Sequence, residues 1–156
     1  MKTLIIEEHG DLLKKDVQIK VHQVNCQGVM GSGLAKKIRD LYPIVYNKYK
    51  ECCSKRTPNE LLGGIQIIAV DDTHYYCNLF GQLNYGRGKL QTDYKKFEQA
   101  LYLLNNYVMI NNIVNIAFPK YIGCGLAGGD WSIVYNLIQK YFGENCKDIT
   151  CYIIEY

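Results

Sequence analysis

Two glycine-rich segments occupy the same kind of position in this sequence. The stretches "VNCQGVMGSGL" (24–34) and "PKYIGCGLAGG" (119–129) each follow a strand-like run and precede a helix-like run. In open α/β sheets such loops lie beyond the carboxyl ends of strands, where ligands bind. The pair therefore predicts an α/β fold with a ligand site built from two loops.

Short β-type runs alternate with longer helical patterns along the whole chain. We expect strands at 2–7, 18–24, 63–70, 73–80, 112–118 and 149–155. We expect helices at 33–41, 43–54, 94–108 and 130–142. Pro43 suits the first turn of the second helix, and Thr92 and Asp130 are the expected caps of the third and fourth.

This order of elements predicts a three-layer α/β/α domain around a central mixed β-sheet. The turn at Asp71-Asp72 is expected to make a hairpin of two strands, and the "GD" turn at 10–11 separates the two opening strands. Both pairs would break a purely parallel order. A chain of 156 residues suits one domain spanning 1–156.

The composition excludes several classes of protein. A net charge of +3 with scattered Lys and Arg argues against a surface that coats a polyanion. The sequence has no signal-like or membrane-spanning apolar run, and its seven cysteines form no CxxC pair. We expect a cytoplasmic monomer with no metal, no cofactor and no membrane partner.

Both glycine loops suit an anionic ligand. Glycine permits positive φ and lets phosphate oxygens approach the main chain, and helix N-termini attract anions. Two such loops facing each other would hold a diphosphate without a lysine. The alternative is that both are only tight turns. Other phosphate motifs do not fit, because Gly28, Gly31 and Gly33 give GxxGxG rather than GxGxxG, and no Gly-Lys-Ser/Thr is present.

Four segments together resemble a macrodomain, the ADP-ribose-binding α/β/α fold. They are "HGDL", "HQVNCQGVMGSGLAKKIRDLYP", "YYCNLFGQ" and "PKYIGCGLAGGDW", in this order along essentially the whole chain. Within that family the chain is most similar to the branch of yeast ADP-ribose 1''-phosphate phosphatase, its phage homologues and the terminal ADP-ribose protein glycohydrolase. High Tyr, Asn, Ile and Lys usage is compatible with an AT-rich viral genome.

The resemblance implies an ADP-ribose site and its residues. Asp11, followed by Leu12, matches the acidic residue that accepts the adenine amino group. The other matching positions belong to the two loops that wrap the terminal ribose and the diphosphate: Asn25, Gln27, Gly28, Val29, Met30, Gly31, Ser32, Gly33, Ile122, Gly123, Cys124, Gly125, Leu126 and Ala127.

Two departures from the family bear on the chemistry. The protein glycohydrolase uses a lysine shortly after the strand matching "YYCNLF" and an aspartate directly after "GCGL", where this chain has Gly81-Gln82 and Ala127. A covalent lysyl intermediate is thereby excluded, because glutamine has no nucleophilic amine. The remaining pattern favours the phosphatase branch, with ADP-ribose 1''-phosphate as substrate.

Three side chains are candidates for catalysis, each with a structural alternative. His22 would transfer protons, since its intrinsic pKa suits neutral pH, or be a half-buried structural histidine. Asn25 would hydrogen-bond the distal ribose or only stabilise its own loop. Asp130 would orient or deprotonate a water or only cap its helix. Arg87 and Lys120 could meet phosphate, with solvated surface as the default for both.

Three functions remain open at this stage. The first is the phosphatase just described. The second is an ADP-ribosyl hydrolase acting on modified protein or nucleic acid. The third is a non-catalytic reader that binds free or protein-linked ADP-ribose. All three use one site, so binding alone does not separate them.

Overall fold

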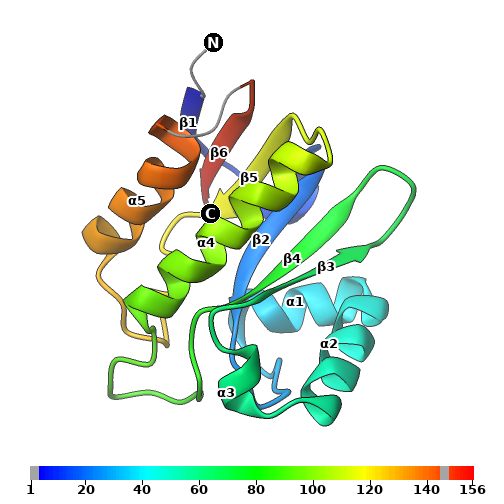
Figure 1. Ribbon diagram of the computed structural model, residues 1–156, viewed down its shortest axis with the longest axis vertical. Coiled ribbons are helices and arrows are strands. Elements are labelled where there is room, and N and C mark those ends of the chain that lie inside the picture. The colour runs from blue at the N-terminus through cyan, green and yellow to red at the C-terminus, as the bar shows by residue number, and fades with distance from the viewer. Residues whose placement is uncertain (1–3, 145–147) are drawn as a thin grey trace.

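The computed structural model describes residues 4–144 and 148–156 and shows the expected three-layer α/β/α fold (Figure 1). Its six-stranded sheet has the order β1-β6-β5-β2-β4-β3. The strands are β1 (Leu4–His9), β2 (Ile19–Val24), β3 (Ile65–Ala69), β4 (Tyr75–Phe80), β5 (Asn115–Pro119) and β6 (Thr150–Glu155).

Helices cover both faces of this sheet (Figure 1). They are α1 (Gly33–Leu41), α2 (Pro43–Lys55), the short α3 (Pro58–Leu61), α4 (Tyr94–Ile110) and α5 (Trp131–Gln139), together with a 3-10 turn η1 (Leu12–Lys14) and a π-helical turn η2 (Lys140–Glu144). The apolar faces of α4 and α5 pack on one side of the sheet. Those of α1 and α2 pack on the other.

The expected strand pairing was wrong for the two opening strands. β1 pairs in parallel with β6 at one edge of the sheet, whereas β2 lies between β5 and β4 and is parallel to both. Only the hairpin of β3 and β4 breaks the parallel order. The reason lies in burial, because five of the six residues of β2 are buried and such a strand needs neighbours and helices on all sides.

Thr92 does not cap α4. The cap is Asp93, whose carboxylate accepts a hydrogen bond from the Lys96 amide. Thr92 is buried, and its hydroxyl donates to the Gly123 carbonyl at 2.6 Å. The Thr92 hydroxyl is therefore bonded to a loop thirty-one residues away in sequence and does not cap the N-terminus of α4.

Two further differences concern helix ends. The expected helix at 130–142 ends at Gln139 and continues as the π-helical turn over 140–144. The expected cap Asp130 is confirmed, because its carboxylate accepts from the Ser132 amide at 2.8 Å. α3 was not expected, and it is a single turn held by a capping box between Thr57 and Glu60.

The sheet order explains where a crevice forms. β2 and β5 are neighbours, but β2 continues into α1 on one face while β5 continues into α5 on the other. The two connecting loops diverge at this point, beyond the carboxyl ends of the strands. Both glycine loops belong to this place in the fold.

Candidate functional site

A cleft of about 700 Å³ opens at the carboxyl ends of β2, β4 and β5. This volume is in the range of small-molecule and cofactor sites. Its walls come from the end of β2, the first glycine loop (residues 25–33), the first turn of α1, the second glycine loop (residues 120–129) and a third loop (residues 81–93). The lining residues are His22, Gln23, Val24, Asn25, Val29, Gly31, Ser32, Gly33, Leu34, Ala35, Gln82, Tyr85, Gly86, Arg87, Pro119, Lys120, Tyr121, Ile122, Gly123, Gly125, Leu126 and Ala127.

Asn25 holds the first glycine loop together from within. Its side-chain amide donates to the Val29 carbonyl at 2.7 Å, and its side-chain oxygen accepts from the Gln27 amide at 2.9 Å. The buried Tyr49 hydroxyl, on α2, lies 2.8 Å from both the main-chain and side-chain oxygens of Asn25. These contacts fix the conformation of the first glycine loop. Asn25 therefore stabilises its own loop, and this role does not depend on a contact with a ligand.

The glycines of the two loops serve different purposes. A Cβ atom built at Gly33 or Gly125 would meet nothing within 4 Å, so these positions leave space open beside the cleft. A Cβ atom at Gly123 would lie 3.0 Å from side-chain oxygens of Gln23 and Thr92. Positive φ angles of 59° and 74° favour glycine at Gly33 and Gly123, Gly123 is also closely packed, and the space beside Gly33 and Gly125 would let a ligand approach the main chain.

The N-terminus of α1 faces the cleft with free amides. Gly33, Leu34 and Ala35 line the cleft, and the Ser32 side chain at the N-cap makes no capping hydrogen bond. The first amides of a helix have no partner inside the helix, and together with the helix dipole they favour an anion. The second glycine loop lines the same cleft. Its Ile122, Cys124, Gly128 and Gly129 amides are bonded to main-chain carbonyls, which leaves the amides of 123 and 125–127 for an anion.

The third loop is tied to the second glycine loop. The amides of Gln91 and Thr92 both donate to the Ala127 carbonyl, at 2.7 and 3.2 Å. Gln82 and Thr92 form an isolated antiparallel bridge that closes the base of the third loop. These contacts hold the base of the third loop beside the cleft. Tyr85, Gly86 and Arg87, at the tip of this loop, line the cleft wall.

Arg87 and Lys120 are the charged side chains among the cleft-lining residues, and no lining residue is an aspartate or glutamate. Lys120 pairs with Glu155 at 3.3 Å. Within the described ranges Arg87 has no hydrogen bond or ion pair, and it is exposed at the loop tip. Both side chains border the cleft, and because Glu155 offsets the charge of Lys120, Arg87 is the residue whose charge favours an anionic ligand there.

His22 is fully buried rather than half-buried, and its tautomer follows from its partner. Its Nε2 atom lies 2.5 Å from the side-chain oxygen of Asn78, whose amide group donates to Gln66 at 3.1 Å. Nε2 must therefore donate, which leaves Nδ1 as an acceptor, and Nδ1 has no partner. Burial lowers the pKa of His22 to about 4, so the ring is neutral at pH 7.

Asp130 does not line the cleft. Its exposed carboxylate accepts from both the amide and the hydroxyl of Ser132, and these bonds lower its pKa. The two loop cysteines are also poor candidates for chemistry, because burial raises the pKa of Cys26 to about 12 and that of Cys124 to about 11. Both are thiols at neutral pH.

Six expected binding residues do not border the cleft directly: Asp11, Leu12, Gln27, Gly28, Met30 and Cys124. Asp11 caps η1 by accepting from the Leu13 amide at 2.9 Å. Gln27 donates to the Leu83 carbonyl at 3.1 Å and so ties the first glycine loop to the third loop. Met30 and Leu12 are core residues.

A family profile described as "Macro domain" matches residues 21–138. The chain belongs to the macro domain family. The match covers the strand that carries His22, both glycine loops and α4, and so includes every wall of the cleft. In the described residues of this macro domain, no cluster of His, Cys, Asp and Glu is arranged to hold a metal ion. No helix there has the length and hydropathy needed to cross a bilayer.

Curated relatives of this macro domain carry two kinds of name. A "DNA ADP-ribosyl glycohydrolase" of Mycobacterium tuberculosis is 30% identical over 139 residues, which cover 86% of this chain and 38% of that protein. An "ADP-ribose 1''-phosphate phosphatase" of Chaetomium globosum is 35% identical over 66 residues, which cover 42% of this chain and 36% of that protein. Both names are those of hydrolases. The chain spans little more than a third of the length of these relatives.

Solved structures share the fold. The macrodomain of Thermus aquaticus DarG superposes with a TM-score of 0.83 at 23% identity, covering 99% of both chains. Thermosipho africanus DarTG in complex with ADP-ribose gives a TM-score of 0.82 at 24% identity, covering 98% of this chain and 42% of that one. The three-layer architecture expected from sequence is therefore that of known macro domains.

Proposed function

We propose that this macro domain binds ADP-ribose in the cleft and hydrolyses ADP-ribose 1''-phosphate to ADP-ribose and phosphate. The observation that carries the proposal is the character of the cleft wall. Main-chain donors of α1 and the second glycine loop line the cleft, Arg87 adds positive charge, and no carboxylate lines the wall. Such a wall suits a ligand with a diphosphate and a further phosphate.

In the proposed complex the diphosphate lies between the amides of residues 31–35 and 123–127. The adenine extends toward Asp11, and the distal ribose lies against the first glycine loop near Asn25. One side-chain amide hydrogen of Asn25 holds Val29, and its second hydrogen is available to a ribose hydroxyl. Support for this orientation comes from the open positions at Gly33 and Gly125.

The proposed reaction needs a water nucleophile. Its oxygen attacks phosphorus, the bond from phosphorus to the 1''-oxygen breaks, and the released sugar oxygen takes a proton from solvent. Nδ1 of His22 is the proposed acceptor of the water's proton, because it is unprotonated at pH 7 and lacks a partner. The atom is buried in this structure, so the bound substrate must bring the water within its reach. The loop amides and Arg87 stabilise the charge on the phosphoryl oxygens. A base with a pKa of about 4 is weak, so we expect slow turnover.

An ADP-ribosyl hydrolase acting on modified nucleic acid or protein is the second candidate. The observation in its favour is that the match to the mycobacterial glycohydrolase spans 86% of this chain, against 42% for the fungal phosphatase. Gln82 and Ala127 count against it, since the resemblance implies a lysine and an aspartate there. A reader that binds ADP-ribose without turnover is the third outcome that the test must separate.

One panel of substrates separates these functions. The purified chain is incubated with ADP-ribose 1''-phosphate, ADP-ribosylated single-stranded DNA and a protein ADP-ribosylated on carboxylates, and released phosphate and ADP-ribose are measured. The proposal expects phosphate release from the first substrate alone, with His22→Gln strongly reduced. Release of ADP-ribose from either macromolecule favours the second function. Calorimetric binding of ADP-ribose with no turnover of any substrate indicates the reader.

A further inference from the structure

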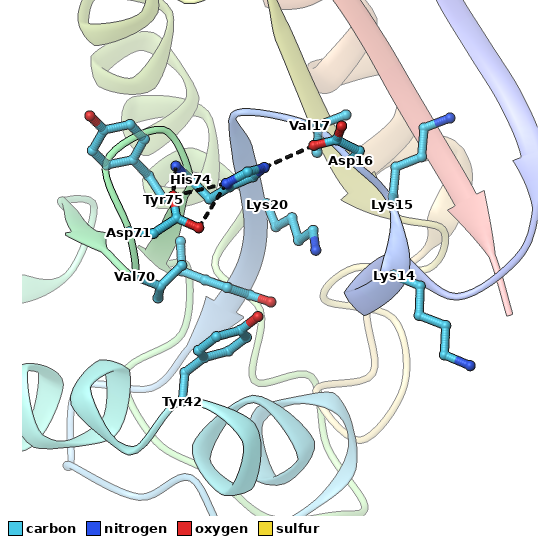
Figure 2. Close-up of a pocket in the computed structure, with 11 residues that line it drawn as sticks. Lys14, Lys15, Asp16, Val17, Lys20, Tyr42, Val70, Asp71, His74 and Tyr75 are labelled. Atoms are coloured by element: carbon cyan, nitrogen blue, oxygen red, sulfur yellow. Dashed lines mark hydrogen bonds and ion pairs between the residues drawn. The ribbon is translucent and has the colours of Figure 1, made fainter.

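A second, smaller pocket lies at the opposite end of the same strands from the cleft. Its volume is about 220 Å³, and it shares no lining residue with the cleft (Figure 2). It is formed by the start of β2 and β4, the end of β3 and the junction of α1 and α2. The lining residues are Lys14, Lys15, Asp16, Val17, Lys20, Tyr42, Val70, Asp71, His74, Tyr75 and Tyr76.

Lys20 brings a buried positive charge to this pocket. The residue is 8% exposed, and its ammonium group donates to the Leu13 carbonyl at 2.7 Å. No carboxylate of the described residues lies within ion-pair distance of it. Asp11 and Asp16 act on it only from a greater distance. A buried ammonium group without a close counter-ion is costly, because a carbonyl replaces only part of its hydration.

Tyr76 adds a hydroxyl that lacks a partner. The residue is 2% exposed, and its buried hydroxyl makes no hydrogen bond. Its ring packs against that of Tyr42, with centroids 5.3 Å apart, and the Lys20 ammonium lies 5.8 Å from the Tyr76 ring centroid. Buried hydroxyls are nearly always satisfied by protein or by water, so this one needs a partner from outside the chain.

The other charged groups of the pocket are already engaged or turned outward. His74 lies between Asp16 and Asp71, at 2.8 and 2.9 Å, so both rim carboxylates are engaged with its ring, and the protonated ring offsets one of their two negative charges. Figure 2 shows Lys14 and Lys15 directed away from the space and Lys20 directed into it. Inside the pocket, the Lys20 ammonium and the Tyr76 hydroxyl are therefore the groups available to a ligand. Both can donate hydrogen bonds, so they suit a ligand with a negatively charged acceptor.

We propose that this pocket binds a small oxyanion, a carboxylate or a phosphate, whose oxygens accept hydrogen bonds from the Lys20 ammonium and the Tyr76 hydroxyl. One ligand would compensate the buried charge and satisfy the buried hydroxyl together. The pocket is smaller than the usual range for nucleotide-sized ligands, so it is not a second ADP-ribose site. The proposal does not depend on the function of the cleft.

The test measures thermal stability against phosphate, sulfate, acetate and chloride at fixed pH and ionic strength, with ADP-ribose saturating so that the cleft is occupied. We expect phosphate or acetate to raise Tm saturably by about 2–4 °C over chloride. The Lys20→Met variant should lose this rise and keep its response to ADP-ribose. Lys95→Met, which removes an exposed lysine of α4, should respond as the wild type does.

Tyr76→Phe is the second variant, because it keeps the ring and removes only the unpartnered hydroxyl. It should fold with a Tm equal to or above that of the wild type and bind the anion more weakly. Crystals soaked in selenate should show anomalous density beside Lys20. An unchanged anion response in Lys20→Met, density in the cleft alone, or no saturable response in the wild type would each overturn the proposal.

Discussion

The Nε2 atom of His22 donates a hydrogen bond to the side-chain oxygen of Asn78, 2.5 Å away on the neighbouring strand β4. Because the side-chain amide of Asn78 also donates to Gln66, rotating the Asn78 amide or the His22 ring by 180° would break a hydrogen bond. The pair fixes a neutral histidine that lines the cleft and whose other nitrogen, Nδ1, is buried without a hydrogen-bond partner. Two consequences can be measured, one for stability and one for catalysis.

The lowered pKa of His22 makes stability depend on pH. In the unfolded chain the pKa returns to 6.5, so between pH 6.5 and about 4 the unfolded state binds more protons than the folded one. Stability should therefore fall as pH drops through this window, by about 3 kcal/mol in total. Urea unfolding of the wild type and His22→Gln at pH 4 to 7 measures it. The variant should lack this component, and identical slopes would contradict a buried neutral His22.

Tyr49→Phe tests the support of the first glycine loop. The variant removes the hydroxyl that lies 2.8 Å from two oxygens of Asn25, in a fully buried position. We expect a loss of about 1–2 kcal/mol in unfolding free energy, because a buried acceptor loses its donor. The Kd for ADP-ribose should rise by several fold as the loop loosens. Tyr46→Phe, on the same helix, is the control, and equal behaviour of both variants would argue against this support.

Asp130 variants separate helix capping from catalysis. Asp130→Ala should unfold at a lower Tm, because the Ser132 amide loses its acceptor. Asp130→Asn should keep the cap and the stability. Since Asp130 does not line the cleft, both should keep kcat within about twofold when assayed well below Tm. A large loss of kcat in Asp130→Asn with normal stability would instead show that the carboxylate takes part in the reaction.

Arg87 should contribute to substrate affinity through its charge. Arg87→Gln is expected to raise KM for ADP-ribose 1''-phosphate about 10-fold, the effect of losing one hydrogen bond to a charged group. Lys89→Gln removes a charge from the same loop at a residue that does not line the cleft, and it should leave KM nearly unchanged. If both variants raise KM equally, the loop acts only through long-range attraction. In that case KM of the two variants, measured at increasing salt concentration, would depend on salt with equal slopes.

The two departures at Gln82 and Ala127 allow a gain-of-function test. Both residues line the cleft, and Gln82 accepts a hydrogen bond from the Gln23 amide at 2.8 Å, an acceptor that a lysine at 82 would remove. The double variant Gln82→Lys with Ala127→Asp should release ADP-ribose from modified protein or DNA faster than the wild type. Gln82→Lys alone is the matched control. If a stably folded double variant releases ADP-ribose no faster than the wild type, residues other than 82 and 127 also determine which reaction is catalysed.

The sequence predicts local features well where one residue decides them. Pro43 opens α2, and the helix expected at 33–41 has those bounds in the structure. The hairpin expected at Asp71-Asp72 forms between β3 and β4. Each of these depends on neighbours in the chain. The pairing of β1 with β6 joins opposite ends of the chain, and no local pattern near residue 4 or residue 150 encodes it.

The candidate site shows the same division. The two glycine loops line the cleft as the strand-loop-helix pattern led us to expect. The third loop was not expected there, although Gly86 and Gly88 around Arg87 were a signal that a flexible tip carries a charge. Its position depends on two hydrogen bonds to the Ala127 carbonyl, a contact across some thirty-five residues of sequence. Such contacts follow only from the fold.

The central claim is that main-chain amides of two facing loops hold the diphosphate of ADP-ribose. A crystal structure with ADP-ribose tests it most directly. The account predicts diphosphate oxygens within about 3 Å of amides in residues 31–35 and 123–127, with the distal ribose beside the first glycine loop. A diphosphate bound through side chains elsewhere, or a cleft that stays empty at saturating ADP-ribose, would contradict it.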